Sequence, residues 1–183
     1  MKLWFRILFI KLTWRRRSKL TIDEVSRIDL RVWPSDLDVY NHMNNGIFLT
    51  IMDLGRFDQG LRTGIWKIWD KKGWYPIVVN STISYRKSLE PWQKFTLETK
   101  VLGWDDIAYY IEQRFVHNGE IYAKAIMRGR FLKRPWGTLT PKEVMEGSGG
   151  WPGEVPVVPE WIMRWGDDVA LPKGKEPAPS TWD

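Results

Sequence analysis

The sequence predicts an α+β fold, in which an antiparallel β-sheet packs against one long helix. Residues 26–33 alternate between polar and apolar side chains, as a half-buried strand does, and residues 44–64 carry apolar side chains at helical spacing. Four more alternating strands are expected at residues 77–86, 94–101, 107–117 and 120–134. This element order is typical of a sheet with a helix on one face.

Turn residues mark the boundaries of these elements. Pro34 ends the first strand, and Gly64 is expected to cap the long helix. Asn118-Gly119 predicts a tight hairpin between the last two strands, because both central residues of that turn need positive φ. Residues 65–74 are expected to form a connector, and the four later strands to form a meander.

Composition limits the chemistry that this chain can carry. A net charge of +6 favours an anionic partner, such as a phosphorylated small molecule, nucleic acid or an anionic membrane. No cysteine is present, so disulfides and thiolate chemistry are excluded, and two histidines argue against a histidine-rich metal site. We therefore expect no metal. No nucleic-acid-binding motif accompanies the basic residues, so no nucleic-acid partner is expected.

The length suggests one domain, residues 25–140, between two extensions. Residues 1–24 are basic and amphipathic, and residues 1–19 are too short and too charged to span a bilayer. Two interpretations remain open: this segment packs against its own domain or a partner subunit, or it anchors the protein at an anionic membrane surface.

The C-terminal arm, residues 141–183, is rich in proline, glycine and tryptophan. Such a composition predicts an extended segment, with one short helix around residues 159–169. Residues 173–183 are predicted to be disordered.

Residues 36–45 are the most unusual stretch of the chain. They place two carboxylates, one histidine and three asparagines immediately before the long helix. A single Asp or Asn is enough to cap a helix, so the excess of polar side chains indicates a site. Within the stretch, Asp36 and Asn44 are expected to be cap or turn residues.

The pattern Asp-x-Asp-x-x-x-His-x-Asn-Asn, between a strand and a long helix, resembles the hotdog-fold acyl-CoA thioesterases of the 4-hydroxybenzoyl-CoA thioesterase type. The residues of this motif are most similar to those of the thioesterase-like branch that includes thioesterase superfamily member 6. The resemblance implies a hotdog fold, in which an antiparallel sheet wraps around one central helix. It also implies hydrolysis of an acyl-CoA, with coenzyme A as part of the substrate and no separate cofactor.

The resemblance assigns roles residue by residue. Asp38 falls on the catalytic aspartate, which is the nucleophile or general base, and His42 and Asn45 fall on positions that line the same pocket. Asp53 and Arg56 fall on a helix signature with a structural role. Family members are homodimers or dimers of dimers, with the pocket between two protomers, and this chain is expected to assemble likewise.

Two positions depart from the family pattern. The family commonly has glycine before the histidine, whereas this chain has Asn41, which is expected to narrow the site or cap the helix. The aromatic residue that the 4-hydroxybenzoyl enzymes carry at the Asn45 position is absent. A 4-hydroxybenzoyl substrate is therefore not supported, and a lipid-like acyl group is expected instead.

The chemistry also needs donors for the oxyanion and cations for the phosphates of coenzyme A. The free amides at the start of the helix, residues 44–46, are suited to the first task. Four basic residues are expected to bind the phosphates: Arg86, Lys87, Arg128 and Arg130. The apolar side chains of Ile47, Ile51 and Tyr85 are candidates to line an acyl tunnel.

Alternatives remain for the carboxylate and for the function. Asp58 is the second candidate acid, although solvation or a pair with Arg62 at i+4 is a simpler interpretation. A chain that kept the fold and lost turnover would be a non-catalytic acyl-CoA or lipid-binding protein. We expect a cytoplasmic location, with residues 1–19 as the candidate membrane contact.

Overall fold

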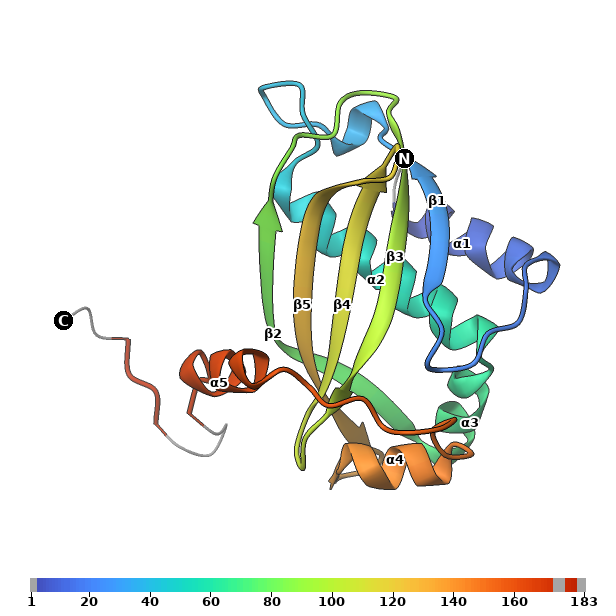
Figure 1. Cartoon of the computed structure of the whole chain (residues 1–183), viewed down its shortest axis with the longest axis vertical. Helices are drawn as coiled ribbons and strands as arrows, with labels where there is room; N and C mark the ends of the chain where they lie inside the picture. The colour runs from blue at the N-terminus through green and yellow to red at the C-terminus, as the bar shows by residue number, and fades with distance from the viewer. Residues whose placement is uncertain (1–2, 173–176, 181–183) are drawn as a thin grey trace.

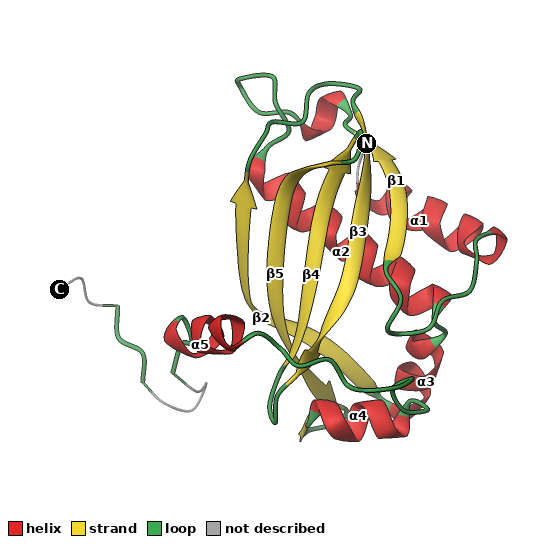
Figure 2. Ribbon diagram, viewed as in Figure 1, coloured by secondary structure: helices red, strands yellow, loops and turns green. Residues whose placement is uncertain are grey.

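The computed structural model describes residues 3–172 and 177–180, and Figures 1 and 2 show a curved sheet with one long helix along one face. The strands are β1 (Ser26–Arg31), β2 (Trp74–Tyr85), β3 (Lys94–Trp104), β4 (Tyr109–His117), β5 (Glu120–Lys133) and the short β6 (Thr138–Leu139). All pairs are antiparallel, in the order β1-β3-β4-β5-β2, with β6 beside β5. The predicted α+β fold is confirmed.

The long helix is α2 (Asn45–Arg62), as the apolar periodicity predicts. Its buried face, which includes Phe48, Ile51 and Leu54, packs into the main hydrophobic core on the sheet. Thr63 caps its C-terminus, and Gly64 follows in the left-handed conformation that suits glycine. The sheet curls around this helix, as Figure 2 shows.

Gly55 sets how closely α2 approaches the sheet. A Cβ atom at this position would lie 2.5 Å from Thr99 Oγ1 and 2.8 Å from Gln113 Nε2. The fully buried Gln113 side chain joins the two layers, because its amide donates to the Met52 carbonyl and to Thr99 Oγ1, both at 2.9 Å. Its oxygen accepts a hydrogen bond from Arg56 at 2.6 Å. Helix and sheet are therefore held at one fixed distance.

The predicted meander of four consecutive strands is wrong in one respect. Strands β3, β4 and β5 do form a meander, and Asn118 and Gly119 make the predicted turn with φ angles of 49° and 77°. Strand β2, however, pairs with β5 instead of β3. Residues 86–93 cross the end of the sheet, where the Arg86 and Lys87 N–H groups donate to the Tyr122 carbonyl of β5. This crossing brings the end of β2 beside the start of α2.

Three shorter helices lie around the sheet. Helix α3 (Ile65–Lys72) occupies the segment expected to be a connector, and α4 (Pro141–Gly147) begins the C-terminal arm. Helix α4 was not predicted, whereas helix α5 (Glu160–Asp168) in the same arm is the short helix expected around residues 159–169. Its buried Ile162 packs with Tyr110 and Ile126, and Figure 1 shows α5 on the side of the sheet away from α2. Most of residues 173–183, which were predicted to be disordered, lie outside the described residues.

The N-terminal segment forms α1 (Leu3–Thr13) and the 3-10 turn η1 (Trp14–Arg16). Leu3, Ile7 and the buried Ile10 contribute to the main core, and Figure 1 shows α1 at the β1 edge of the sheet. The structure thus has this segment packed against its own domain. Among the described residues, no helix has the length and apolar character needed to cross a membrane.

Candidate active site

The loop between η2 (Pro34–Asp36) and α2 turns tightly around the side chain of Asp38. Asp38 Oδ1 accepts hydrogen bonds from the main-chain N–H groups of Tyr40, at 2.9 Å, and His42, at 3.2 Å. The Asp38 N–H donates to the His42 carbonyl at 2.8 Å. These bonds hold one carboxylate oxygen in the turn, and Oδ2 has no hydrogen-bond partner among the described residues.

Asn41 adopts a φ of 61°, which is in the left-handed region that glycine enters without steric cost and asparagine tolerates. Asn41 and the glycine usual at this position therefore satisfy the same backbone requirement. The expectation that Asn41 caps the helix is wrong. Asn44 is the cap instead, because its Oδ1 accepts a hydrogen bond from the Gly46 N–H at 2.8 Å.

Asp36 anchors the loop that carries Asp38. Its buried carboxylate forms an ion pair with Arg6 of α1 and accepts a hydrogen bond from the Trp33 N–H at 2.8 Å. Its carbonyl accepts a hydrogen bond from the Asn44 N–H, also at 2.8 Å. Asp36 is therefore a turn residue, as predicted, and it fixes both ends of the segment that carries Asp38.

One pocket of about 200 Å³ brings together the three predicted catalytic residues and two of the predicted cations. Its lining residues are Asp38, His42, Met43, Asn45, Phe48, Tyr85, Arg86, Lys87 and Ser88. The pocket exists because the crossing after β2 passes the first turn of α2. Met43 N–H donates to the Leu89 carbonyl at 2.8 Å, which joins the two segments directly.

Tyr85 forms one wall of this pocket. Its hydroxyl donates to the Asn45 carbonyl at 3.2 Å, and its ring meets Phe48 edge to face at 5.1 Å. Burial raises the pKa of the Tyr85 phenol above its ordinary value. Of the three residues expected in an acyl tunnel, Tyr85 lines the pocket, whereas Ile51 is fully buried in the core.

One residue at the N-terminus of α2, Asn45, lines the pocket and has a free main-chain N–H. The Asn44 amide is bound to the Asp36 carbonyl, and the Gly46 amide is bound to the Asn44 side chain. The Asn45 amide has no acceptor among the described residues. It belongs to the first helical residue, where the positive end of the helix dipole favours a developing negative charge.

Arg86 and Lys87 make the mouth of the pocket positive. Both form ion pairs with Glu120, and all three side chains are at least 44% exposed. The hydrogen bond from Lys87, reinforced by the charges of Lys87 and Arg86, lowers the pKa of Glu120. Two cations against one carboxylate leave a net positive charge where an anionic substrate arm would enter.

Arg128 and Arg130 do not line this pocket. Arg128 is buried and donates to the Gly166 carbonyl and to the Asp167 carboxylate of α5. It lies six residues along β5 from Tyr122, which is roughly 20 Å of extended strand. The expectation that these two arginines share a site with Arg86 and Lys87 is not supported, because the long β5 carries them toward the opposite end of the sheet.

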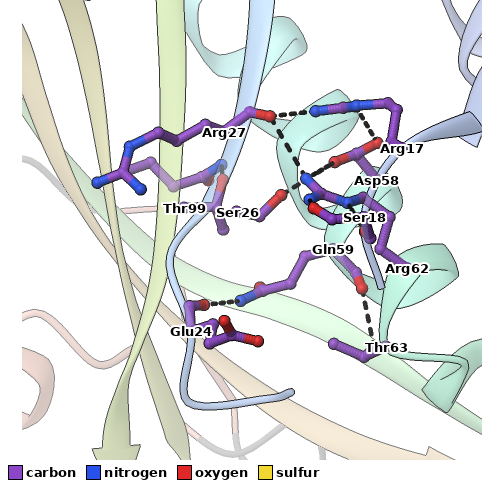
Figure 3. A network of polar contacts seen from close by, with 11 residues as sticks. Arg17, Ser18, Glu24, Ser26, Arg27, Asp58, Gln59, Arg62, Thr63 and Thr99 are labelled. Atoms are coloured by element: carbon purple, nitrogen blue, oxygen red, sulfur yellow. Dashed lines mark hydrogen bonds and ion pairs between the residues drawn. The ribbon is translucent and has the colours of Figure 1, made fainter. Parts of the chain in front are cut away.

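Asp58, the alternative acid, has a structural role. Figure 3 shows its carboxylate between Arg17 and Arg62, with Ser26 Oγ donating to it at 2.9 Å. The side chain is fully buried, so the interpretation as a solvated residue is wrong and the pair with Arg62 is confirmed. Asp53 and Arg56 also form an ion pair on α2.

Comparison with known proteins identifies the family. The model of the thioesterase-like superfamily matches residues 32–166, which include the loop, the pocket and the whole sheet beyond β1. The chain belongs to this superfamily. Protein THEM6 from Xenopus laevis, a related sequence, is 34% identical over 134 residues, which cover 73% of this chain and 63% of that protein. The chain therefore spans less than two thirds of the length of that relative.

Solved structures show the same fold. The probable thioesterase YbaW from Escherichia coli aligns with a TM-score of 0.63 at 20% identity, over 67% of this chain and 95% of that one. A 1,4-dihydroxy-2-naphthoyl-CoA thioesterase from Synechocystis aligns with a TM-score of 0.58 at 8% identity, over 68% and 95%. The thioesterase-like superfamily and these neighbours confirm the hotdog fold for this chain.

Within the described residues, no group of three or more His, Asp or Glu side chains is placed to hold a metal ion.

Sequence reasoning missed part of the pocket wall. Phe48 is one of the apolar residues of the helix predicted over residues 44–64, and Ser88 follows the basic pair in the crossing after β2. No local pattern marks Ser88, because its place depends on β2 pairing with β5. The place of Phe48 in the pocket wall could have been predicted from the sequence, because Phe48 lies one helical turn after Asn44 on the face that meets the sheet.

Proposed function

We propose that this protein is an acyl-CoA thioesterase in which Asp38 activates water, or attacks directly, at the thioester carbonyl. The observation that carries the proposal is one pocket lined by Asp38, His42 and Asn45, the residue whose main-chain N–H is free at the start of α2. A carboxylate and an oxyanion donor in one pocket are the two groups that thioester hydrolysis requires. Membership of the thioesterase-like superfamily supports the same reaction class.

The proposed reaction with water as nucleophile proceeds in two steps. Asp38 takes a proton from water while the water oxygen attacks the carbonyl carbon, and the Asn45 amide stabilises the oxyanion that forms. The oxyanion then collapses, the C–S bond breaks, and the thiol leaves with the proton that Asp38 held. His42, which lines the same pocket, would orient the water. In the alternative with Asp38 as nucleophile, water hydrolyses the acyl anhydride in a second step.

Arg86 and Lys87 are proposed to bind the phosphates of coenzyme A. Their exposure and their place at the pocket mouth suit an anionic arm that lies outside while the thioester enters. A lipid-like acyl group would contact the aromatic rings of Phe48 and Tyr85, which line the pocket.

The protein is also proposed to act as a homodimer or a dimer of dimers. Strand β2 is an edge of the sheet, and Val78 and Val79 on it are exposed. An open edge with apolar side chains is a surface that a partner strand commonly covers. Sedimentation velocity tests this directly, since a monomer at micromolar concentration would contradict it.

The proposed role of the Asn45 amide can be tested with one substitution. Proline is tolerated at the first position of a helix and removes only the N–H, and Asn44 already has the extended conformation that a following proline requires. Asn45→Pro should therefore keep the fold and lower kcat for acyl-CoA by about 100- to 1000-fold. Asn45→Ala is the matched control, because it removes the side chain and keeps the amide.

The assay is release of free thiol from a panel of short, long and aromatic acyl-CoA esters. Loss of turnover in Asn45→Pro but not in Asn45→Ala supports the amide as the oxyanion donor. Equal rates in both variants would rule out that role. If the wild type binds acyl-CoA and releases no thiol from any ester, the protein is a non-catalytic acyl-CoA-binding member of the superfamily.

A further inference from the structure

Helix α1 has two apolar faces, and only one of them is used within the molecule. On the inner face, Ile10 is buried in the main core, and the buried guanidinium of Arg6 pairs with Asp36 and donates to the Arg31 carbonyl at 3.1 Å. These contacts fix the rotation of α1 about its own axis. The same side chains of α1 therefore face outward in the folded protein.

The outer face is a continuous stripe of large apolar side chains. Five residues at helical spacing are between 51% and 79% exposed: Trp4, Phe5, Leu8, Phe9 and Leu12. Single exposed apolar residues are ordinary, but a contiguous group on one helix marks a surface that contacts another apolar phase. Helix α1 lies at the margin of the molecule in Figure 1.

Basic residues follow this stripe, and acidic residues are absent from it. Residues 1–22 contain no Asp or Glu. Arg6 and Arg17 are used in ion pairs with Asp36 and Asp58. Lys11, Arg15, Arg16 and Lys19 are exposed, and no ion pair with a carboxylate is recorded for them among the described residues. The charge of this region is therefore wholly positive.

We propose that the outer face of α1, with the adjoining basic residues of η1, binds the surface of an anionic lipid bilayer. An exposed apolar stripe with basic residues at its end is the pattern of helices that lie in a membrane interface. Anionic lipid headgroups complement the positive charge. A second copy of the chain would place the same uncompensated cations against each other, which disfavours it as the occupant.

Membrane binding would also orient the cavities of the protein. Phe5 and Phe9 line a groove of about 1000 Å³ beside β1 and β3, and Trp4 and Ile7 line a mostly apolar cavity of about 450 Å³ beside α2. Residues of the stripe line both cavities, so a bilayer bound to the stripe would lie beside them. The binding proposal itself does not depend on the thioesterase activity.

The test is flotation of the 183-residue chain with two kinds of vesicle, phosphatidylcholine alone and phosphatidylcholine with 30% phosphatidylglycerol. We expect binding to the anionic vesicles and much weaker binding to the neutral ones. Leu8→Ser/Leu12→Ser removes apolar contact, and Arg15→Glu/Arg16→Glu reverses charge. Each should lower the partition coefficient by about thirtyfold or more.

The matched control is Lys124→Glu/Lys142→Glu, which changes the net charge equally at exposed positions on β5 and α4. It should bind nearly as the wild type does. Circular dichroism and thermal unfolding confirm that each variant folds, since all four substituted α1 and η1 residues are exposed. Failure of the wild type to bind anionic vesicles, or equal loss in the control, overturns the proposal. So does a wild-type oligomer that Leu8→Ser/Leu12→Ser dissociates without any change in vesicle binding.

Discussion

The guanidinium of Arg6, on α1, forms a buried ion pair with the carboxylate of Asp36, two residues before Asp38. This ion pair joins the N-terminal helix to the proposed catalytic loop. The Asp36 carboxylate also accepts a hydrogen bond from the Trp33 N–H, and the Asp36 carbonyl accepts one from the Asn44 N–H, so a shift of Asp36 would move both ends of the loop. The first helix is thus part of the framework of the site.

Removing Arg6 should destabilise the protein and disturb the site. Arg6→Met leaves the Asp36 carboxylate buried without its partner, which costs about 3–5 kcal/mol for a buried pair. Urea unfolding measures this loss. Arg15→Met, at an exposed position, should change the free energy of unfolding by less than about 0.5 kcal/mol. A value for Arg6→Met as small as the control would mean that the pair does not hold the loop.

Gly55 should not tolerate a side chain. Gly55→Ala places a methyl group against Thr99 and Gln113, so α2 must move away from the sheet, at a cost of about 1–3 kcal/mol. Leu49→Ala, on the exposed face of the same helix, should cost less than about 1 kcal/mol. Thermal unfolding compares the two. Equal melting temperatures for Gly55→Ala and the wild type would contradict the close contact.

Asn41 should be replaceable by glycine and not by a β-branched residue. Asn41→Val forces a branched side chain to positive φ, which costs about 1–3 kcal/mol and should displace the Asp38 turn. Asn41→Gly should keep both stability and thioester turnover. Val39→Ala, in the same turn and almost fully exposed, is the control. Equal turnover in Asn41→Val and Asn41→Gly would show that the turn does not matter.

The pKa of Glu120 should depend on Lys87. In the folded protein the pKa is lowered, chiefly by the Lys87 hydrogen bond, so the folded state holds the deprotonated carboxylate to lower pH than the unfolded chain does. The associated stability is present above the unfolded pKa and is lost as pH falls through the folded pKa. Carbon-detected NMR titration should show a higher Glu120 pKa in Lys87→Gln. No change would contradict the pairing at the pocket mouth.

Local patterns predicted the central elements because each one carries its own signal. The period of residues 44–64 gives α2, and Asn118-Gly119 gives the β4–β5 hairpin. Helix α4 was missed although Thr140 and Glu143 form a capping box that the sequence displays. Helix α3 has only eight residues between Gly64 and Gly73, which is too short for a period to stand out.

Long-range pairing was the part that the sequence could not supply. No local pattern states that β2 joins β5, and this pairing decides that Arg86 and Lys87 reach the pocket while Arg128 does not. Likewise, α1 is apolar on two sides, so its sequence allowed either face to pack inward. The buried ion pair between Arg6 and Asp36 decides which face of α1 packs inward, and these two residues are 30 positions apart in the sequence.

The rate of thiol release by Asp38→Asn tests the central claim most directly. The substitution keeps the size of the side chain and an oxygen that can accept the turn hydrogen bonds, but it removes the carboxylate base. Asp53→Asn, on the exposed side of α2, is the matched control. We predict that Asp38→Asn binds acyl-CoA and loses at least about 100-fold in kcat, while Asp53→Asn keeps the wild-type rate. An Asp38→Asn protein that hydrolyses acyl-CoA at the wild-type rate would contradict the account.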